Sequence, residues 1–286
     1  MNNNFVKYLK EDSYGYKKRL NYLIKYIQNN NKIKNVLEIG CGTGFGLLYP
    51  VAKNFHEISF VGEDIHQQSI DFANKKNNLS NLIFRISNSE KENKTYDIII
   101  ISEVLEHVDE PQKLLLDIKS KLSKSGILFI TLPNGYGPFE IVSTFMRILD
   151  FFNLTKKLRN FKRKLVPRRI ANQNIEEPNI KVADSLADSP HINFFNFNEI
   201  KSLIYFSGYQ IISNKKRTFI CGDPIDILIN KLNLANLNSK IADYLPNIFV
   251  SDWMFIVKKT SVKVKKYKPP LNCWVKFRRY LISNNI

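Results

Sequence analysis

The segment NVLEIGCGTGFG, residues 35–46, constrains the fold of this chain more than any other. An apolar run ends in an acid, Glu38, and glycine then occupies every second position. These glycines are Gly40, Gly42, Gly44 and Gly46. In open sheets of parallel strands, ligands bind outside the carboxyl ends of the strands, where a glycine turn follows the first strand. The segment therefore predicts the first strand of a doubly wound α/β sheet and a ligand-binding turn after it.

Apolar runs of strand length recur after this segment and alternate with helical patterns. The expected strands are residues 35–40, 58–65, 82–87, 96–102 and 126–133. Between them, residues 44–54, 66–76 and 110–122 have apolar residues at helical spacing, with Gly126 as a stop after the third helix. Nearly continuous apolar strands are typical of parallel sheets covered on both faces. The alternation predicts right-handed crossovers between parallel strands.

Three further segments extend the pattern. Residues 196–208 are expected to form a helix closed by Gly208, and residues 209–221 and 251–260 an antiparallel strand pair. The expected fold is a doubly wound, mostly parallel, seven-stranded Rossmann-like sheet with an antiparallel last strand and a helical lid insertion.

The same pattern predicts the organisation of the chain. Residues 1–34 are expected to form an N-terminal helical cap, and residues 35–260 the main domain. Within that domain, residues 134–190 are expected to be the lid and residues 223–249 a second helical insertion, because neither segment continues the strand rhythm. Residues 261–286 read as a basic amphipathic tail.

The chain has a formal net charge of +17, and the excess lies in two segments. Residues 151–175 contain eight Lys or Arg and residues 253–286 contain nine, and neither segment contains an acid. Residues 139–165 and 271–282 also have the spacing of amphipathic helices, which suits a membrane interface. We therefore expect an anionic membrane surface as a partner. A solvated basic face, or packing of the tail on its own domain or a partner subunit, is the alternative.

The cellular compartment is suggested by three features. No apolar run reaches the length of a transmembrane helix. The N-terminal residues include acids where a signal peptide has its apolar core. Three cysteines, odd in number and far apart, argue against a disulfide framework. A cytoplasmic protein, in part peripheral at the inner face of a membrane, is the expectation.

The glycine turn lacks both common phosphate-binding patterns. No Lys-Ser or Lys-Thr follows at P-loop spacing, and G-x-G-x-x-G fails because its third position is Phe45 or Leu47. The carboxylate of Glu38 would repel a pyrophosphate but would suit a cationic ligand without phosphate. S-adenosylmethionine, with its sulfonium and α-ammonium groups, is such a ligand. Asp64 ends the second strand, where a carboxylate can accept hydrogen bonds from a ribose diol.

Four motifs carry a family resemblance: VLEIGCGTG, FVGEDI, YDIIIISEVLEHV and GILFITLPN. Together they resemble the class I S-adenosylmethionine-dependent methyltransferases, in the small-molecule branch that includes ubiquinone-biosynthesis and sugar-modifying enzymes. The resemblance covers residues 30–135 well and 191–220 weakly. It implies that the following residues bind the cofactor: Glu38, Gly40, Cys41, Gly42, Gly44, Asp64, Ile65, Asn88, Ser89, Ser102 and Glu103. Asn88 stands where the family usually has an aspartate near the adenine.

The chemistry expected is methyl transfer to a small-molecule, saccharide or lipid-linked acceptor, most simply at oxygen. His107, in the loop after the fourth strand, is the candidate general base, with bracing of that loop as the alternative. Glu103 and Glu106 lie nearby, but the spacing does not predict a metal site. Asn134, Tyr136 and His191 are the candidate acceptor contacts. An RNA-modifying enzyme and a catalytically silent cofactor-binding scaffold are the alternative functions.

Overall fold

The structure is a computed structural model and describes residues 15–87, 94–152, 190–222, 225–269 and 272–283. Asn88 and Ser89, two predicted adenine contacts, lie outside the described residues, as does most of the basic segment 151–175. The predicted lid and tail are described only in part, so their roles stay predictions.

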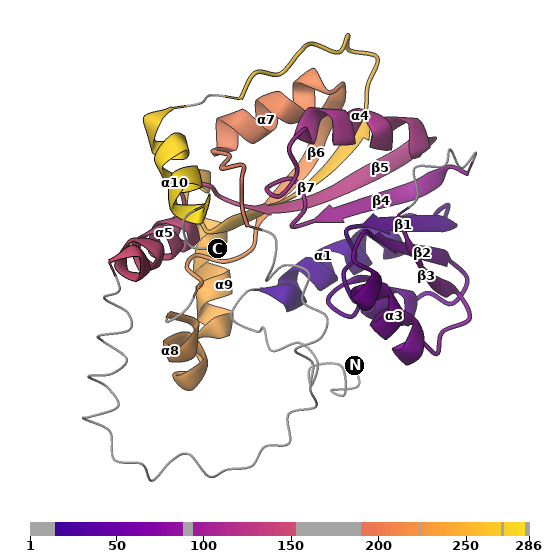
Figure 1. The fold of residues 1–286 in the computed structure, drawn as a ribbon. Coiled ribbons are helices and arrows are strands. Elements are labelled where there is room, and N and C mark those ends of the chain that lie inside the picture. Colours follow the sequence, from indigo (N-terminus) through magenta and orange to yellow (C-terminus); the bar gives the residue numbers. More distant parts are fainter. Residues whose placement is uncertain (1–14, 88–93, 153–189, 223–224, 270–271, 284–286) are drawn as a thin grey trace.

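Seven strands form one sheet in the order β3-β2-β1-β4-β5-β7-β6 (Figure 1). Their bounds are β1 Asn35–Ile39, β2 Ser59–Asp64, β3 Leu82–Ile86, β4 Tyr96–Ser102, β5 Leu122–Pro133, β6 Tyr209–Lys216 and β7 Asp252–Lys259. Strands β1 to β5 pair in parallel, and β7 runs antiparallel between β5 and β6. The predicted doubly wound, mostly parallel sheet with an antiparallel last strand is confirmed. The strand order reverses between β1 and β4, which is where such sheets bind ligands.

The sheet is covered by helices on both faces (Figure 1). The helices are α1 Tyr16–Gln28, α2 Leu48–Ala52, α3 Gln67–Lys76, α4 Pro111–Lys121, α5 Pro138–Phe151, α7 Phe197–Phe206, α8 Ile225–Lys231, α9 Ala235–Tyr244, the 3-10 turn η3 Asn247–Phe249, and α10 Cys273–Ser283. Helices α1, α2 and α3 pack in one apolar core and α4 and α7 in the other. Helices α5, α8, α9 and α10 lie toward the carboxyl ends of the parallel strands.

The run of isoleucines in β4 explains why the central strands are apolar throughout. Successive side chains of a strand point to opposite faces. Ile98 and Ile100 therefore belong to the core under α1, while Ile99 and Ile101 belong to the core under α4 and α7. All four are fully buried. A strand buried on both faces has only its ends left for polar groups, and this directs the functional side chains to the sheet edge.

The ends of α4 and α7 follow from local sequence. Pro111 occupies the first turn of α4, where its missing N–H costs nothing. Asn196 and Glu199 form a reciprocal capping box at the start of α7. Helix α7 is followed by Gly208 with φ 77°, a left-handed conformation that glycine adopts without strain.

The structural role of Gly126 differs from the predicted role as a helix stop. It does not stop α4, which already ends at Lys121, but lies inside β5. The pairing of β5 with β4 shifts register between Tyr96 and Ile98, so that residues 123–126 bulge beside Tyr96. A Cβ atom at position 126 would lie 2.8 Å from the carbonyl oxygen of Tyr96. Close approach of the two backbones, and not helix termination, explains this glycine.

A side chain at position 126 is therefore expected to destabilise the protein. Gly126→Ala should lower the free energy of unfolding by about 1–3 kcal/mol, because the backbone of β4 must move. Urea denaturation measures this change. Ser125→Ala is the matched control, since Ser125 is exposed and exposed positions usually change stability by less than about 0.5 kcal/mol. Equal stability of the two variants would contradict the contact with Tyr96.

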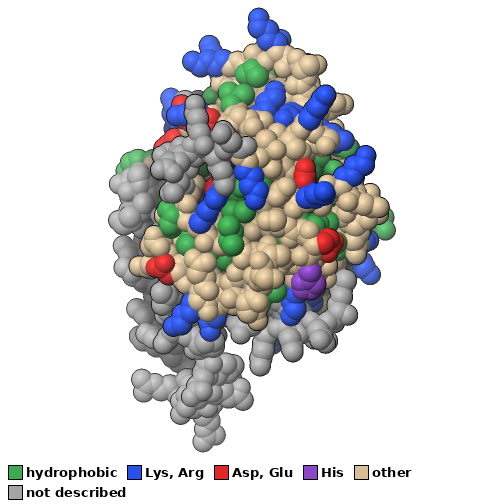
Figure 2. Space-filling view, turned by 90° about the vertical axis from the view of Figure 1, so that its right-hand side faces the viewer, with side chains coloured by type: hydrophobic (Ala, Val, Ile, Leu, Met, Phe, Trp, Pro, Cys, Tyr) green, Lys and Arg blue, Asp and Glu red, His purple; other side chains and the backbone are tan. Residues whose placement is uncertain are grey.

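Exposed apolar side chains gather on the helices at the carboxyl end of the sheet. They include Ile141 and Phe145 of α5, Ile227 and Leu228 of α8, Leu237 and Tyr244 of α9, and Trp274, Phe277 and Tyr280 of α10. Figure 2 shows the face seen from the right-hand side of Figure 1, where Lys and Arg side chains are dispersed with few acids between them. Among the described helices, none has both the length and the apolar character needed to cross a bilayer.

Candidate functional site

The glycine turn after β1 is held against its neighbours by backbone shape. Gly40, Gly42 and Gly44 all have positive φ, at 70°, 53° and 72°. A Cβ atom at Gly40 would lie 2.6 Å from Val104 Cγ2, and one at Gly44 would enter the ring of Phe84. Both the left-handed backbone and the close contacts require glycine here. The turn thus brings the backbone of β1 next to the loop after β4.

Asp64 fastens this turn. Its carboxylate accepts hydrogen bonds from the backbone N–H of Gly42 at 2.7 Å and of His66 at 2.8 Å. The predicted contact with a ribose diol stays a prediction, which the remaining lone pairs of the carboxylate allow. Ile65 follows and is 86% exposed, so its side chain is open to a ligand. Cys41 is half-buried, and burial together with Glu38 and Asp64 raises the pKa of its thiol.

Glu38 is a carboxylate buried at the end of β1. It is 3% exposed and accepts a hydrogen bond from the backbone of Leu48. Its Oε2 atom has no hydrogen-bond partner among the described residues. Burial raises the pKa of Glu38 to about 8, and Arg19 opposes this rise. Without a ligand, Glu38 therefore carries a proton at pH 7, and a cationic ligand would favour its ionised form.

Arg19 is the main residue of this crevice that the sequence reasoning missed. It belongs to α1, is 4% exposed, and donates from Nη1 to Ser102 Oγ at 2.7 Å. Its Nη2 atom donates to Gly46 O at 3.3 Å, and its Nε atom has no partner within the described chain. The available signal was helical spacing, because Arg19 shares the buried face of α1 with Leu23 and Ile27.

A line of hydrogen bonds connects Arg19 to Glu103. Ser102 Oγ accepts from Arg19 and lies 2.7 Å from Thr131 Oγ1, which in turn donates to Glu103 Oε1 at 2.7 Å. Glu103 has φ 58°, an uncommon conformation for a residue other than glycine. Burial opposes ionisation of Glu103, but Arg217 and Arg19 outweigh it and hold the pKa of Glu103 below its usual value.

Arg217 is a second site residue that the sequence did not predict. It forms ion pairs with two acids. Its Nη1 atom lies 3.1 Å from Glu103 Oε1, and its Nε atom lies 2.9 Å from Asp252 Oδ2. Asp252 also accepts from the backbone and the hydroxyl of Thr218. Because these residues lie after β4, after β6 and at the start of β7, the ion pairs tie three strands together beside the site.

A cavity of about 160 Å³ opens between these groups. Its lining residues include Tyr16, Glu103, His107, Phe139, His191 and Arg217. They come from α1, the ends of β4 and β6, α5, and the segment before α7. The predicted residues Glu103, His107 and His191 are therefore brought together in one small chamber, although His191 is distant in sequence.

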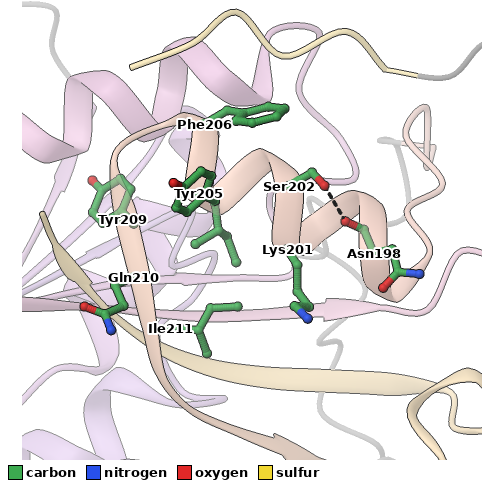
Figure 3. A pocket seen from close by; sticks show the side chains of 9 residues that line it. Asn198, Lys201, Ser202, Tyr205, Phe206, Tyr209, Gln210 and Ile211 are labelled. Atoms are coloured by element: carbon green, nitrogen blue, oxygen red, sulfur yellow. Dashed lines mark hydrogen bonds between the residues drawn. The ribbon is translucent and has the colours of Figure 1, made fainter. Parts of the chain in front are cut away.

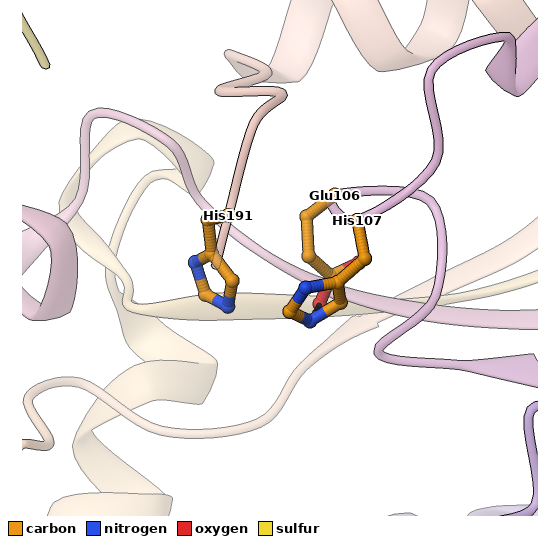
Figure 4. Close-up of side chains that lie close together, drawn as sticks. All are labelled: Glu106, His107 and His191. Atoms are coloured by element: carbon orange, nitrogen blue, oxygen red, sulfur yellow. Dashed lines mark ion pairs between the residues drawn. The ribbon is translucent and has the colours of Figure 1, made fainter. Parts of the chain in front are cut away.

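Two histidines and one acid meet at the wall of this chamber (Figure 4). The rings of His107 and His191 have centroids 4.8 Å apart. Glu106 lies 4.0 Å from His107 Nε2 and is 1% exposed, with both oxygens unpartnered among the described residues. One potential ligand atom of each residue lies within 4.8 Å of the others, a spacing that could hold a metal ion. Burial and the charge of Glu103 raise the pKa of Glu106 well above its ordinary value.

The two other candidate acceptor contacts have partners within the fold. Asn134 is 2% exposed, and its amide donates to the carbonyls of Ile248 and Val250. Its carbonyl accepts from the backbone N–H of Tyr136. This geometry favours a part in shaping the turn after β5 over contact with an acceptor. The Tyr136 hydroxyl accepts a hydrogen bond from Asn272, just before α10.

A second hollow, of about 520 Å³, lies between α7 and β6 (Figure 3). Lys201, Tyr205, Tyr209 and Gln210 line it. No predicted site residue lines it, and it lacks an acid or a histidine. The titratable groups that can do proton chemistry are instead gathered at the carboxyl ends of β1 and β4.

The raised pKa of Glu38 predicts a pH-dependent effect on stability. The pKa of about 8 in the folded protein exceeds the ordinary value of 4.5, so unfolding releases a proton between these pH values. Wild-type stability therefore falls as pH rises through this window, whereas Glu38→Gln lacks the effect. Relative to wild type, the variant should gain roughly 1 kcal/mol per pH unit between pH 5 and 8. Urea denaturation of both proteins measures the difference, and a constant difference would contradict a protonated Glu38.

Comparison with known proteins identifies the family of the chain. A family model described as a methyltransferase domain matches residues 8–214. The ubiquinone biosynthesis O-methyltransferase of Rickettsia canadensis is 26% identical over 200 residues, which cover 63% of this chain and 84% of that protein. A malonyl-(acyl-carrier protein) O-methyltransferase of Halalkalibacterium halodurans is 30% identical over 129 residues, or 43% of this chain and 45% of that protein.

Solved structures show the same fold at low sequence identity. PKMT2 from Rickettsia typhi in complex with AdoHcy has a TM-score of 0.51 at 14% identity, covering 82% of this chain and 51% of that one. An S-adenosylmethionine-dependent methyltransferase from Clostridium acetobutylicum has a TM-score of 0.51 at 12% identity, covering 86% of this chain and 92% of that one. Because the family model spans well over half of the sequence, the chain belongs to the methyltransferase-domain family.

Proposed function

We propose that the chain transfers the methyl group of S-adenosylmethionine to an oxygen of a small-molecule or lipid-linked acceptor. The observation that carries this proposal is a buried acid, Glu38, within electrostatic reach of a buried arginine, Arg19, beside a glycine turn that lacks a phosphate-binding pattern. A buried acid and a buried guanidinium at one strand end match the two charges of an amino acid. The similar proteins from Rickettsia canadensis and Halalkalibacterium halodurans are both O-methyltransferases, which supports oxygen as the acceptor atom.

The cofactor is S-adenosylmethionine, and its methionine end fits the charges of the crevice. The unpartnered Oε2 atom of Glu38 is available to an α-ammonium, and the unpartnered Nε atom of Arg19 to the α-carboxylate. Asp64 would accept from the ribose diol, and the exposed side chain of Ile65 would cover the adenine. In this arrangement Glu38 gives up its proton when the cofactor binds.

The acceptor would enter the cavity beside Glu103, His107 and His191. Methyl transfer is an in-line displacement, so alignment and exclusion of water are the main contributions of the protein. A cavity of about 160 Å³ admits only the reacting part of an acceptor, which leaves the rest of a larger or lipid-linked molecule outside. A neutral hydroxyl also needs a base, and the predicted base His107 and the second histidine, His191, both line this cavity.

The assignment of Arg19 predicts weaker cofactor binding when its charge is removed. A charge-assisted hydrogen bond contributes about 1.5–3 kcal/mol, so Arg19→Met should raise the Kd for S-adenosylhomocysteine about 10- to 100-fold. Isothermal titration calorimetry measures the Kd. Lys17→Met is the control, because Lys17 lies on the exposed face of the same helix. Unchanged affinity of a folded Arg19→Met protein would refute the contact.

We also propose that the carboxyl-end helices dock on an anionic lipid surface. Trp274, Phe277 and Tyr280 of α10 are 43%, 41% and 55% exposed. Residues 253–286, which contain α10, hold no acid. Apolar anchors beside basic residues, with no opposing acid, suit the interface of an anionic bilayer.

Flotation with vesicles tests this docking. Trp274→Ser/Phe277→Ser should reduce binding to vesicles containing phosphatidylserine at least several-fold, because the anchors are lost. Tyr205→Ser is the matched control, an exposed aromatic of α7 that is 51% exposed. Point substitutions are preferable to removal of the tail, because Arg278 of α10 has buried contacts. Equal binding of wild type to neutral and anionic vesicles would refute the electrostatic part.

A further inference from the structure

The two histidines of the cavity differ in the hydrogen-bond partner of their Nδ1 atoms. His191 Nδ1 lies 2.5 Å from Glu140 Oε1, at the start of α5. His107 Nδ1 lies 3.2 Å from the backbone carbonyl of Pro190. In each pair the ring nitrogen donates its hydrogen, because a carboxylate and a carbonyl can only accept. Both rings therefore carry the basic lone pair on Nε2, and the Nδ1–H of His191 points at a carboxylate.

Glu140 is held in place from the opposite side. It is 3% exposed, and Arg278 of α10 forms a buried ion pair with its second oxygen. Arg278 also donates to the carbonyl of Gly135, and its guanidinium lies 3.5 Å over the ring of Phe194. The carboxylate thus has one oxygen on an arginine and the other on a histidine. This arrangement fixes the orientation of the imidazole and places a carboxylate on the nitrogen that keeps its hydrogen.

The contact at Nδ1 of His107 is with a neutral group, the carbonyl of Pro190. A neutral carbonyl orients its ring but supplies no charge to stabilise an imidazolium. Its acidic neighbour Glu106 is 1% exposed and lacks a hydrogen-bond partner in the described part of the chain. Burial raises the pKa of Glu106, and its carboxyl lies 4.0 Å from Nε2, the nitrogen of His107 that would have to act as the base. His107 braces the loop after β4 against the segment that carries His191.

We propose that His191 is the general base of methyl transfer, with Glu140 and Arg278 as its positioning residues. The acceptor hydroxyl gives its proton to His191 Nε2 as its oxygen forms a bond to the methyl carbon. The bond between carbon and sulfur breaks, and its electron pair neutralises the sulfonium. The imidazolium, whose Nδ1–H remains on Glu140, then returns the proton to water. This assignment rests on the proposed O-methylation.

Kinetics on phenols of graded acidity test the base. A general base contributes about 10²- to 10⁴-fold, so His191→Ala should lose at least 100-fold in kcat with an unchanged Kd for S-adenosylhomocysteine. The loss should narrow as the phenol becomes more acidic, because an ionised acceptor needs no base, and added imidazole should restore part of the rate. His107→Ala is the matched control and should lose less than about 10-fold. The loss of kcat in Glu140→Gln should lie between those of His191→Ala and His107→Ala, because the amide keeps the shape of the side chain but not its charge.

A second measurement examines the histidine without turnover. In ¹⁵N NMR of histidine-labelled protein, His191 should be the tautomer with hydrogen on Nδ1, and Glu140→Ala should shift it toward hydrogen on Nε2. Hydrogen on Nε2 in the wild type would overturn the proposal whatever the activity. So would an activity that a chelator abolishes and one divalent cation restores, because Nε2 would then be a metal ligand.

The outcomes separate the two proposals. The base assignment is overturned if His191→Ala transfers methyl groups as fast as wild type, or if His107→Ala alone abolishes transfer. Either result leaves the proposed O-methylation unaffected. Absence of transfer by wild type to every phenol counts against O-methylation, and the base assignment fails with it. If His191→Ala lowers kcat by the same factor for all phenols, His191 has a structural role, and the base assignment is overturned as well.

Discussion

The central strands of the sheet are buried on both faces, and this burial decides where polar and charged side chains can lie. β1 and β4 are covered by α1 on one side and by α4 and α7 on the other. Their polar residues can therefore stand only near the strand ends: Asn35 and Asp97 lie at the amino ends, and the acids of the site lie at the carboxyl ends. Glu38, Ser102 and Glu103 occupy those ends. The fold concentrates charge in a small volume because it excludes charge from the buried middle of these strands.

Concentrated charge in a buried volume requires compensation, and elements outside the central strands supply it. Arg19 comes from α1 and Arg217 from the end of β6, and both lower the pKa of Glu103. Glu38 and Glu106 have raised pKa values because burial exceeds what their neighbours offset. A buried carboxyl with a free oxygen destabilises the unliganded fold, and the same group gains most from a ligand. Stability is given up where binding is needed.

Helix α10 contributes both to the interior of the site and to the protein surface. Its inner side places Arg278 on Glu140 and lets Arg279 donate to the carbonyl of Ile192. Its outer side exposes Trp274 and Phe277. A contact at the outer side and the orientation of His191 therefore depend on the same helix. The basic residues of this helix are thus divided between internal and external contacts, a division that composition alone does not reveal.

Much of the fold follows from local pattern, and the site follows from it only in part. The seven strands were predictable because burial on both faces leaves unbroken apolar runs, as in the four isoleucines of β4. The glycine turn and Asp64 were predictable because they adjoin strand ends in sequence. The start of β5 at Leu122 was missed, because Gly126 also suits a helix stop. Arg19 was missed because a buried arginine at helical spacing looks like one on a solvated face.

Local patterns in the sequence account for the order of strands and helices, the glycine turn and the acids at the strand ends, because periodicity and backbone conformation are local properties. Which distant groups meet depends on the packing of the folded chain. Glu140 and His191 are 51 positions apart, and Arg278 and Glu140 are 138 apart. Their contacts depend on how α5, α10 and the segment before α7 pack at the carboxyl edge. Such packing results from shape and burial across the whole fold, so no local pattern records it.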